Sequence, residues 1–328
     1  MRICFDESGS CGAVSGGTGG AKLALGLSRI VPGDNLLVVA NVGDDFEHLG
    51  LHVSPDVDTL MYTLAGLDNT KLGWGRRDET WSFMETLTAL GGEDWFRLGD
   101  RDLAVHVERT IRLRRGESLS TITADFCGRL GVGPRVLPAT DDPVRTRLRT
   151  DEGWLDFQDY FVRLQCRPVV RELAFDGAED ARPHPDLLAA LREERLRAVV
   201  ICPSNPFISV EPILAVPGMR RALSSSQAPI IAVSPIIGGR AVKGPTAKIM
   251  AELGLRPTAA AVAERYGDLL DGYVMDLGDA GEAIHVTPKV TLARTLMTNL
   301  AEREELARVV LEAANALASL KRGRDFVA

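Results

Sequence analysis

The sequence has few of the features that mark secreted, membrane or nucleic-acid-binding proteins. No stretch approaches about 18 uninterrupted apolar residues, the length that a membrane-spanning helix requires. The first seven residues lack the apolar run of a signal peptide. Basic residues are not in excess, since 38 Lys and Arg stand against 45 Asp and Glu, and a protein that chiefly binds nucleic acid needs a basic footprint. We therefore expect a cytoplasmic protein with neither a nucleic-acid nor a membrane partner.

Paired metal-binding and nucleophile motifs are also missing. The five cysteines are odd in number, widely spread and never in a C-x-x-C pair, which indicates neither a disulfide framework nor a zinc ribbon. His48 and His52 have the spacing of two metal ligands on a helix, but Gly50 and Pro55 interrupt a regular helix there, so we interpret the pair as structural or substrate-contacting. The nucleophile motif G-x-S-x-G is absent, and covalent catalysis has no support.

The sequence does contain the alternation of strand-like and helix-like segments that is typical of an α/β protein. Hydrophobic residues make up 45% and charged residues 25% of the chain, as in ordinary soluble domains. From Gly12 on, short apolar runs alternate with amphipathic segments, which is typical of β-α units around a mostly parallel, doubly wound sheet. Buried strands are expected at 13–14, 36–40, 198–202 and 229–234, and helices at 22–30, 57–67, 81–90, 102–115, 118–130 and 301–320. We predict one large α/β domain at 11–328, a helical and strand-rich insertion at 68–175, and a loose segment at 1–10.

A glycine-rich loop follows the first expected strand. Residues 15–22 read SGGTGGAK, and such a loop at a helix N-terminus lets backbone N–H groups approach an anion closely. It is not a Walker A loop, because Ala21 precedes Lys22 and Leu23 follows it. The loop predicts a phosphate site; the alternative is a turn that needs glycine only for steric reasons.

Two acidic segments lie just beyond element boundaries. Residues 41–45 read NVGDD and residues 54–59 read SPDVDT, and magnesium is typically held by one or two carboxylates together with substrate phosphates. The alternative is that Asp44 is a turn residue and Asp56 a helix N-cap. That alternative applies less to Asp45 and Asp58, which are the candidate magnesium ligands.

Three further segments offer groups for a nucleotide or a planar ring. Residues 74–81, WGRRDETW, combine tryptophans that can stack with arginines that can clamp phosphate; alternatively they form only a helix start capped by Asp78. Polar, proline-containing loops follow two later strands, at 202–206 and 234–245. Ligands of open parallel sheets bind at the carboxyl ends of strands, so we expect these loops to meet the glycine loop in one crevice.

Taken in order, these motifs resemble the 2-phospho-L-lactate transferase family of coenzyme F-420 biosynthesis. The resemblance rests on residues 15–22, 41–45, 54–59, 74–80, 204–206 and 234–237. It implies a Rossmann-like fold, Mg²⁺ as cofactor and a homodimer. It also implies that the primary hydroxyl of the deazaflavin Fo attacks the distal phosphorus of a guanosine diphosphate conjugate and expels GMP. The acid of the conjugate, lactyl, enolpyruvyl or glyceryl, stays open.

The resemblance further implies roles for individual residues. Asp45 and Asp58 lie near the metal and Fo and are the catalytic candidates, with Asp45 favoured over Asp44 as the acid closest to the chemistry. The residues expected to contact the ligands are Gly16, Gly17, Thr18, Gly19, Lys22, Asp45, Trp74, Arg77, Asp78, Ser204, Asn205, Pro206, Ser234, Ile236, Gly238 and Lys243.

The competing hypothesis is a nucleotide-sugar-binding regulator from a related family, which shares the glycine loop and an acidic pair after the second strand. We expect such a regulator to lack the segments at 54–59 and 74–80, and their presence favours the transferase. A P-loop-like NTPase is disfavoured by the failed Walker match.

Overall fold

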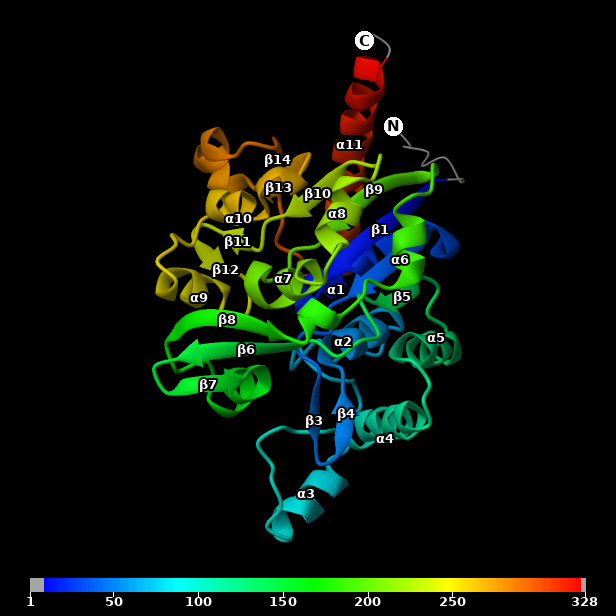
Figure 1. Ribbon diagram of the computed structural model, residues 1–328, viewed down its shortest axis with the longest axis vertical. Coiled ribbons are helices and arrows are strands. Elements are labelled where there is room, and N and C mark those ends of the chain that lie inside the picture. Colours follow the sequence, from blue (N-terminus) through cyan, green and yellow to red (C-terminus); the bar gives the residue numbers. More distant parts are fainter. Residues whose placement is uncertain (1–8, 326–328) are drawn as a thin grey trace.

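The computed structural model describes residues 9–325 and is built around a seven-stranded sheet (Figure 1). The strands follow the order β14-β13-β10-β9-β1-β2-β5, and every neighbouring pair is parallel. Their bounds are β1 Ser10–Ser15, β2 Leu36–Ala40, β5 Arg135–Pro138, β9 Leu196–Ile201, β10 Ile230–Val233, β13 Gly272–Asp276 and β14 Lys289–Ala293. This arrangement confirms the predicted Rossmann-like α/β class.

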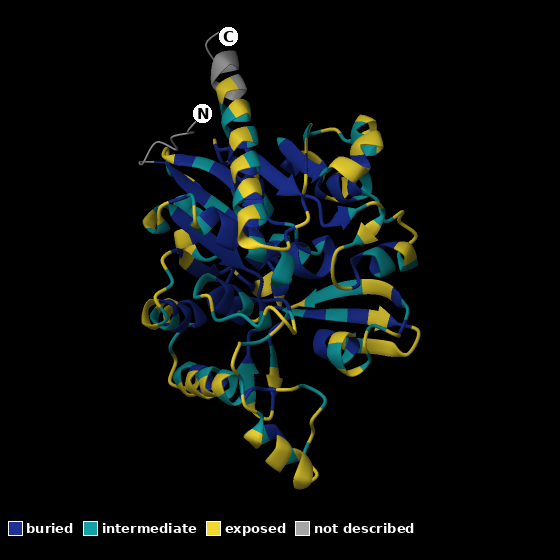
Figure 2. Ribbon diagram, turned by 180° about the vertical axis from the view of Figure 1, so that it is seen from behind, coloured by how far each residue is buried: buried dark blue, intermediate teal, exposed yellow. Residues whose placement is uncertain are grey.

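Helices cover both faces of the sheet, as a parallel sheet requires. The long α11 (Leu300–Asp325) crosses one face beside α1 (Gly17–Ser28) (Figure 2), and α7 (Glu211–Leu214) and α8 (Met219–Ser224) lie on the other (Figure 1). All five residues of β2 are buried, which explains its uninterrupted apolar sequence. The remaining helices are α2 Pro55–Leu64, α3 Ser82–Ala89, α4 Asp100–Arg114, α5 Leu119–Arg129, α6 Pro185–Ala190, α9 Thr246–Glu252 and α10 Ala259–Tyr266.

Three small antiparallel sheets decorate this core. The hairpin of β3 (Phe46–His48) and β4 (Leu51–Val53) projects below the sheet toward α4 (Figure 1). A three-stranded sheet has the order β7-β6-β8, from β6 (Arg145–Thr150), β7 (Gly153–Asp156) and β8 (Val170–Asp176). The short pair β11 (Ile236–Ile237) and β12 (Arg240–Ala241) follows β10. The extended structure expected between 135 and 175 is therefore present.

Two details differ from the sequence-based expectations. Ser10, placed in the loose segment 1–10, is the first residue of β1, because it lies beside Leu196 and its N–H donates to the Arg195 carbonyl; residues 1–8 lie outside the described part of the chain. The range 68–175 is not one continuous insertion, because β5 within it pairs with β2 in the main sheet. The division of the chain into one domain and an elaboration otherwise stays a prediction.

The order of the strands determines where a ligand can bind. β1 lies between β2 and β9, and the chain proceeds outward from it in opposite directions, through β2 to β5 and through β9 to β14. Such a reversal opens a crevice at the carboxyl ends of the central strands. The glycine loop after β1 and the loop at 202–206 after β9 thus face the same crevice. No helix between residues 9 and 325 combines the length and the apolar sequence needed to cross a lipid bilayer.

Candidate active site

A cleft of about 620 Å³ opens at this crevice. Among the predicted residues it brings together Gly16 and Lys243, which are 227 positions apart in the sequence. The predicted residues that line the cleft are Gly16, Gly17, Thr18, Gly19, Lys22, Asp58, Trp74, Ser204, Asn205, Ser234 and Lys243.

Six predicted residues do not line the cleft. Arg77 and Asp78 form an exposed pair with Nε and Oδ2 3.6 Å apart. Ile236 and Gly238 use their N–H groups inside the structure, on Ser234 Oγ and Asp279 Oδ1, and Pro206 and Asp45 are buried. Their contact roles stay predictions; the structure gives each of them another environment.

The glycine loop is held in place from two sides. Gly17 begins α1 with a φ of 66°, a left-handed conformation that glycine adopts without strain. Its N–H donates to Asp56 Oδ1 at 2.5 Å, and the N–H of Gly16 donates to Ser204 Oγ at 3.1 Å. A Cβ on Gly19 would lie 2.5 Å from the Pro203 carbonyl oxygen. Glycine is therefore required here for close packing, as the steric interpretation expects, and the phosphate site stays a prediction.

An acidic cluster lies beside the loop. The Asn41 side-chain amide donates to Asp44 Oδ1 at 2.7 Å and to Asp56 Oδ2 at 3.0 Å. Burial, together with repulsion from Asp56 and Asp45, raises the pKa of Asp44 well above its ordinary value. Burial likewise raises the pKa of Asp56 to about 6. Carboxylates held this close and out of water favour a compensating cation.

Asp45 lies behind this pair rather than in the cleft. Its Oδ2 accepts from the Ser54 hydroxyl at 2.9 Å and lies 3.2 Å from His52 Nε2. Its Oδ1 is buried without a hydrogen-bond partner among the described residues. His52 therefore positions an acidic residue, whereas His48 packs edge-on against Trp95 with ring centroids 5.1 Å apart. Both histidines lie on the β3–β4 hairpin, which excludes the helical metal pair.

Asp58 is engaged by a buried arginine. Arg109, 1% exposed, donates to both Asp58 oxygens, from Nη1 to Oδ2 at 3.0 Å and from Nη2 to Oδ1. Asp58 therefore has no oxygen without a partner. Asp58, Asp102 and His106 nevertheless bring possible ligand atoms within 4.8 Å of one another, and the role of Asp58 as a metal ligand stays a prediction.

Two more residues of α4 interact near the Arg109–Asp58 ion pair, and both line the cleft. His106 lies between two carboxylates, with Nδ1 3.7 Å from Asp58 Oδ2 and Nε2 3.3 Å from Asp102 Oδ2. The Tyr62 hydroxyl donates to Asp102 Oδ1 at 2.5 Å. Burial alone would raise the pKa of Asp102, but His106, Tyr62 and Arg109 outweigh it and lower that pKa. Asp102 is thus an ionised carboxylate at the cleft wall.

Two lysines supply positive charge to the cleft. Lys22 donates from Nζ to the Met297 carbonyl at 3.0 Å, and Lys243 donates to the Gly73 carbonyl. Burial lowers the pKa of both; the neighbouring Arg303 adds to the effect at Lys22, and Lys22 adds to it at Lys243. Crowded, part-buried cations of this kind favour an anionic ligand.

Another part of the cleft wall is aromatic. Phe157 and Phe161 stack with ring centroids 5.3 Å apart, and Trp95 and Phe96 line the cleft as well. Trp95 lies under the Arg163 guanidinium, 4.7 Å from ring centroid to Cζ. Trp74, the predicted stacking residue, lines the cleft but is 46% exposed. Trp95, Phe96 and Phe157 are better buried than Trp74 and are the more suitable platform for a planar ring, whereas Phe161 is 39% exposed.

Sequence reasoning missed several of these groups. For Asp102, His106 and Arg109 a signal existed, because they recur at i, i+4 and i+7 in a helix predicted at 102–115 and so share one face. For Trp95 and Phe157 no local signal existed, since Trp95 lies in a bend before α4 and Phe157 in the helical segment after β7, and the two segments meet only in the fold.

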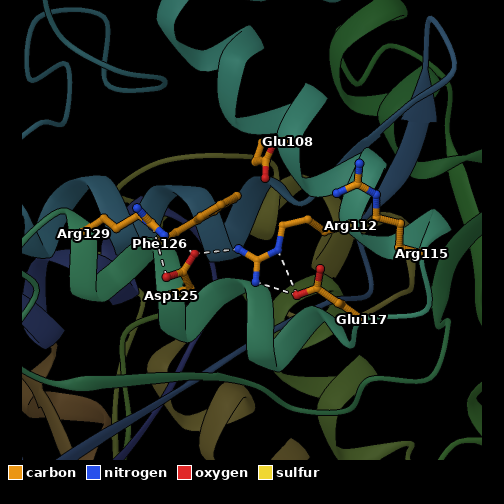
Figure 3. Close-up of a pocket in the computed structure, with 7 residues that line it drawn as sticks. All are labelled: Glu108, Arg112, Arg115, Glu117, Asp125, Phe126 and Arg129. Atoms are coloured by element: carbon orange, nitrogen blue, oxygen red, sulfur yellow. Dashed lines mark hydrogen bonds and ion pairs between the residues drawn. The ribbon is translucent and has the colours of Figure 1, made fainter.

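A second hollow, on the outer side of α4 and α5, has a different character (Figure 3). Arg112 donates to Glu117 Oε2 and Asp125 Oδ2, each at 2.6 Å, and Glu108 and Arg129 complete the charged rim. Opposite charges there neutralise one another at the surface. This hollow has neither a glycine loop nor a set of like charges that calls for a ligand.

Comparisons with known proteins show which proteins this chain is similar to. The family model described as 2-phospho-L-lactate transferase CofD matches residues 12–314. A protein of Streptomyces coelicolor named phosphoenolpyruvate transferase is 41% identical over 307 residues, covering 91% of this chain and 96% of the relative. A protein of Methanosarcina mazei named 2-phospho-L-lactate transferase is 37% identical, covering 91% and 98%. The crystal structure of a UPF0052-family protein from Bacillus halodurans superposes with a TM-score of 0.60 at 16% identity, covering 92% and 99% of the two chains, and shows the fold alone.

Proposed function

This chain belongs to the 2-phospho-L-lactate transferase CofD family, and from that premise we propose that it transfers a phospholactyl-type group to the deazaflavin Fo. The donor is the guanosine diphosphate conjugate of 2-phospho-L-lactate, phosphoenolpyruvate or 3-phosphoglycerate. The primary hydroxyl of Fo attacks the distal phosphorus, GMP leaves, and the phosphodiester product is coenzyme F-420-0 or its dehydro form. The supporting observation is that one cleft joins a glycine loop and two lysines to an aromatic wall.

The glycine-loop end of the cleft suits the diphosphate of the donor. The first turn of a helix leaves N–H groups without intrahelical partners, and its dipole favours negative charge. Lys22 and Lys243 line the same cleft and hold only backbone carbonyls among the hydrogen bonds described above. Ser204, Asn205 and Ser234 line the cleft after β9 and β10, where hydroxyl and amide groups suit the guanosine. Positioning and charge neutralisation provide most of the catalysis in phosphoryl transfer.

The aromatic wall suits the acceptor. A deazaflavin is a large planar ring, and Trp95, Phe96, Phe157 and Phe161 offer apolar ring faces and edges to it. Asp58 and Asp102 lie on the neighbouring part of the cleft wall. The hydroxyl of an acceptor held by these rings would thus share the cleft with these carboxylates.

We propose Mg²⁺ as the cofactor, held by the acidic cluster after β2. The residues present fit a divalent cation, because Asp44, Asp45 and Asp56 repel one another and Asp45 Oδ1 is a buried oxygen without a partner among residues 9–325. When bound, the ion neutralises charge on the phosphate oxygens. Asn41 orients Asp44 and Asp56, and Ser54 orients Asp45.

The relatives' names suggest which donor to test first. The relatives from Streptomyces coelicolor and Kitasatospora aureofaciens, 41% and 42% identical, are both named phosphoenolpyruvate transferase. We therefore propose the enolpyruvyl conjugate as the first donor. A homodimer is proposed on the family resemblance, and light scattering of the purified protein tests it.

The decisive experiment incubates purified protein with Fo, Mg²⁺ and each of the three conjugates. It follows GMP release and the mass of the deazaflavin product. A phosphodiester-linked deazaflavin is the expected result and names the donor. Guanosine nucleotide binding without product from any donor would instead favour the nucleotide-sugar-binding regulator.

A further inference from the structure

The carboxylates of the cleft differ in what their oxygens contact. Among the described residues, Asp44, Asp56, Asp58 and Asp102 line the cleft. Both Asp58 oxygens accept from Arg109, and both Asp56 oxygens accept hydrogen bonds, from Gly17 and Asn41. The Asn41 side-chain amide, which donates to Asp56, also donates to Asp44 Oδ1.

Asp44 and Asp102 each have one carboxylate oxygen to which no hydrogen bond is described. Burial and the neighbouring Asp56 and Asp45 raise the pKa of Asp44 well above its ordinary value, whereas the pKa of Asp102 is lowered, so Asp102 is the ionised carboxylate of the two. Its Oδ1 accepts from Tyr62, while Oδ2 lies 3.3 Å from His106 Nε2 without the alignment of a hydrogen bond. The side chain is 15% exposed, and this exposure faces the cleft. His106 is itself 1% exposed and has its other ring nitrogen 3.3 Å from Arg109 Nη1. His106 also lines the cleft, and its position between Arg109 and Asp102 lets it orient the Asp102 carboxylate.

The chain also links Asp102 to both ends of the cleft. The aromatic residues Trp95 and Phe96 lead through Arg97 directly into α4, whose first turn contains Asp102. From the other end, α2 begins at the glycine loop with Asp56 and reaches Asp102 through Tyr62. Short stretches of chain thus connect Asp102 both to the aromatic wall and to the glycine loop.

We propose that Asp102 accepts the proton of the attacking hydroxyl group, with Tyr62 and His106 as positioning residues. The inference rests on the proposed transfer to a hydroxyl acceptor. The O–H bond of the acceptor breaks as its oxygen bonds to phosphorus, and the proton passes to Asp102 Oδ2. The bond between phosphorus and the GMP oxygen breaks with its electron pair on GMP, which leaves as a phosphate and needs no proton. Asp102 then returns its proton to solvent.

An aspartate is a sufficient base for this step. Phosphoryl transfer has a loose transition state in which the nucleophile forms little bond, and protein kinases use an aspartate in the same position relative to a substrate hydroxyl. General-base assistance typically contributes about 10²- to 10⁴-fold in rate.

The test compares Asp102→Asn and Asp102→Ala with the unsubstituted protein in the GMP-release assay, and measures donor and Fo affinity by calorimetry. We expect kcat to fall about 10²- to 10⁴-fold, with both affinities changed by less than about threefold. Added formate, a small carboxylate that fits the space left in Asp102→Ala, should restore part of that rate.

Glu108→Gln is the matched control, because Glu108 lies on the same helix but faces the outer hollow (Figure 3). It should keep native kcat and show no response to formate. Turnover of Asp102→Asn within about threefold of native, or an Asp102→Ala rate that formate leaves unchanged, would overturn the proposal. Absence of turnover by the unsubstituted protein with all three donors would overturn the proposed function itself, which keeps the two failures distinct.

Discussion

Replacing Arg109 by methionine should destabilise the protein more than any other single charge removal in the site. The Arg109 guanidinium is 1% exposed and holds both oxygens of Asp58, whose side chain is 7% exposed. Methionine has similar length and no charge, so Asp58 would be left as a buried, unpaired carboxylate. Breaking a buried pair in this way costs about 3–5 kcal/mol, far more than loss of an exposed pair.

The melting temperature translates this cost into a measurable shift. With an unfolding entropy of about 2.1 cal/mol/K per residue, a chain of 328 residues has about 0.7 kcal/mol/K. A loss of 3–5 kcal/mol therefore lowers Tm by about 4–7 °C. Differential scanning calorimetry at pH 7.5 measures the shift directly.

Two further variants distinguish the loss of stability caused by the unpaired charge from the loss caused by substituting an arginine as such. Arg109→Met combined with Asp58→Asn should lose less than Arg109→Met alone, since no unpaired charge remains in the double variant. Arg129→Met is the surface control, because Arg129 is 75% exposed in its pair with Asp125, and it should cost less than about 1 kcal/mol. A Tm loss below about 1 °C for Arg109→Met, or an equal loss in the double variant, would refute the reasoning.

Three other predictions concern the cleft. Gly19→Ala places a Cβ 2.5 Å from a backbone carbonyl oxygen and should weaken guanosine nucleotide binding at least about tenfold by calorimetry, whereas Gly12→Ala, with nothing within 4 Å, should not. Because burial raises the pKa of Asp56 from 3.8 to about 6, the folded state binds this proton more tightly than the unfolded state. The raised pKa of Asp56 contributes at most about 3 kcal/mol to the free energy of unfolding; this contribution is present below pH 3.8 and is lost as pH rises through 6. Urea unfolding across pH 4–7.5 should show this loss of stability in the native protein and not in Asp56→Asn. Mg²⁺ affinity should correspondingly fall below pH 6 in the native protein. Trp95→Ala should weaken Fo binding by about 1–3 kcal/mol in a direct titration, while Trp154→Ala, outside the cleft on β7, should leave it unchanged; equal effects would contradict an aromatic acceptor site.

Much of the fold was predictable because its signals are local. The apolar run at 36–40 predicts a buried strand from its own composition, and the glycine loop marks the turn from β1 into α1. Strand β5 was not predicted within the main sheet, because Arg135–Pro138 is short and its partner β2 lies nearly 100 residues earlier. Pairing between such distant segments leaves no mark in a local window.

The candidate site divides in the same way. The sequence correctly grouped the glycine loop with Ser204, Ser234 and Lys243, because parallel strands direct their carboxyl ends to one edge. It could not rank the carboxylates. Which acid lies in the cleft depends on the direction of each side chain and on its partners.

Asp56 and Asp58 illustrate the reason. They are two positions apart, and residues at i and i+2 of a helix do not face the same way. Asp56 turns to the glycine loop and Asp58 to Arg109, 51 positions later in the chain. The sequence by itself thus determined the class of fold, the family and the segments that form the cleft, since these follow from local pattern and order. Only the tertiary structure decided which carboxylates are paired, which one is buried behind the site and which ones line the cleft, because burial and long-range partners exist only once the chain has folded.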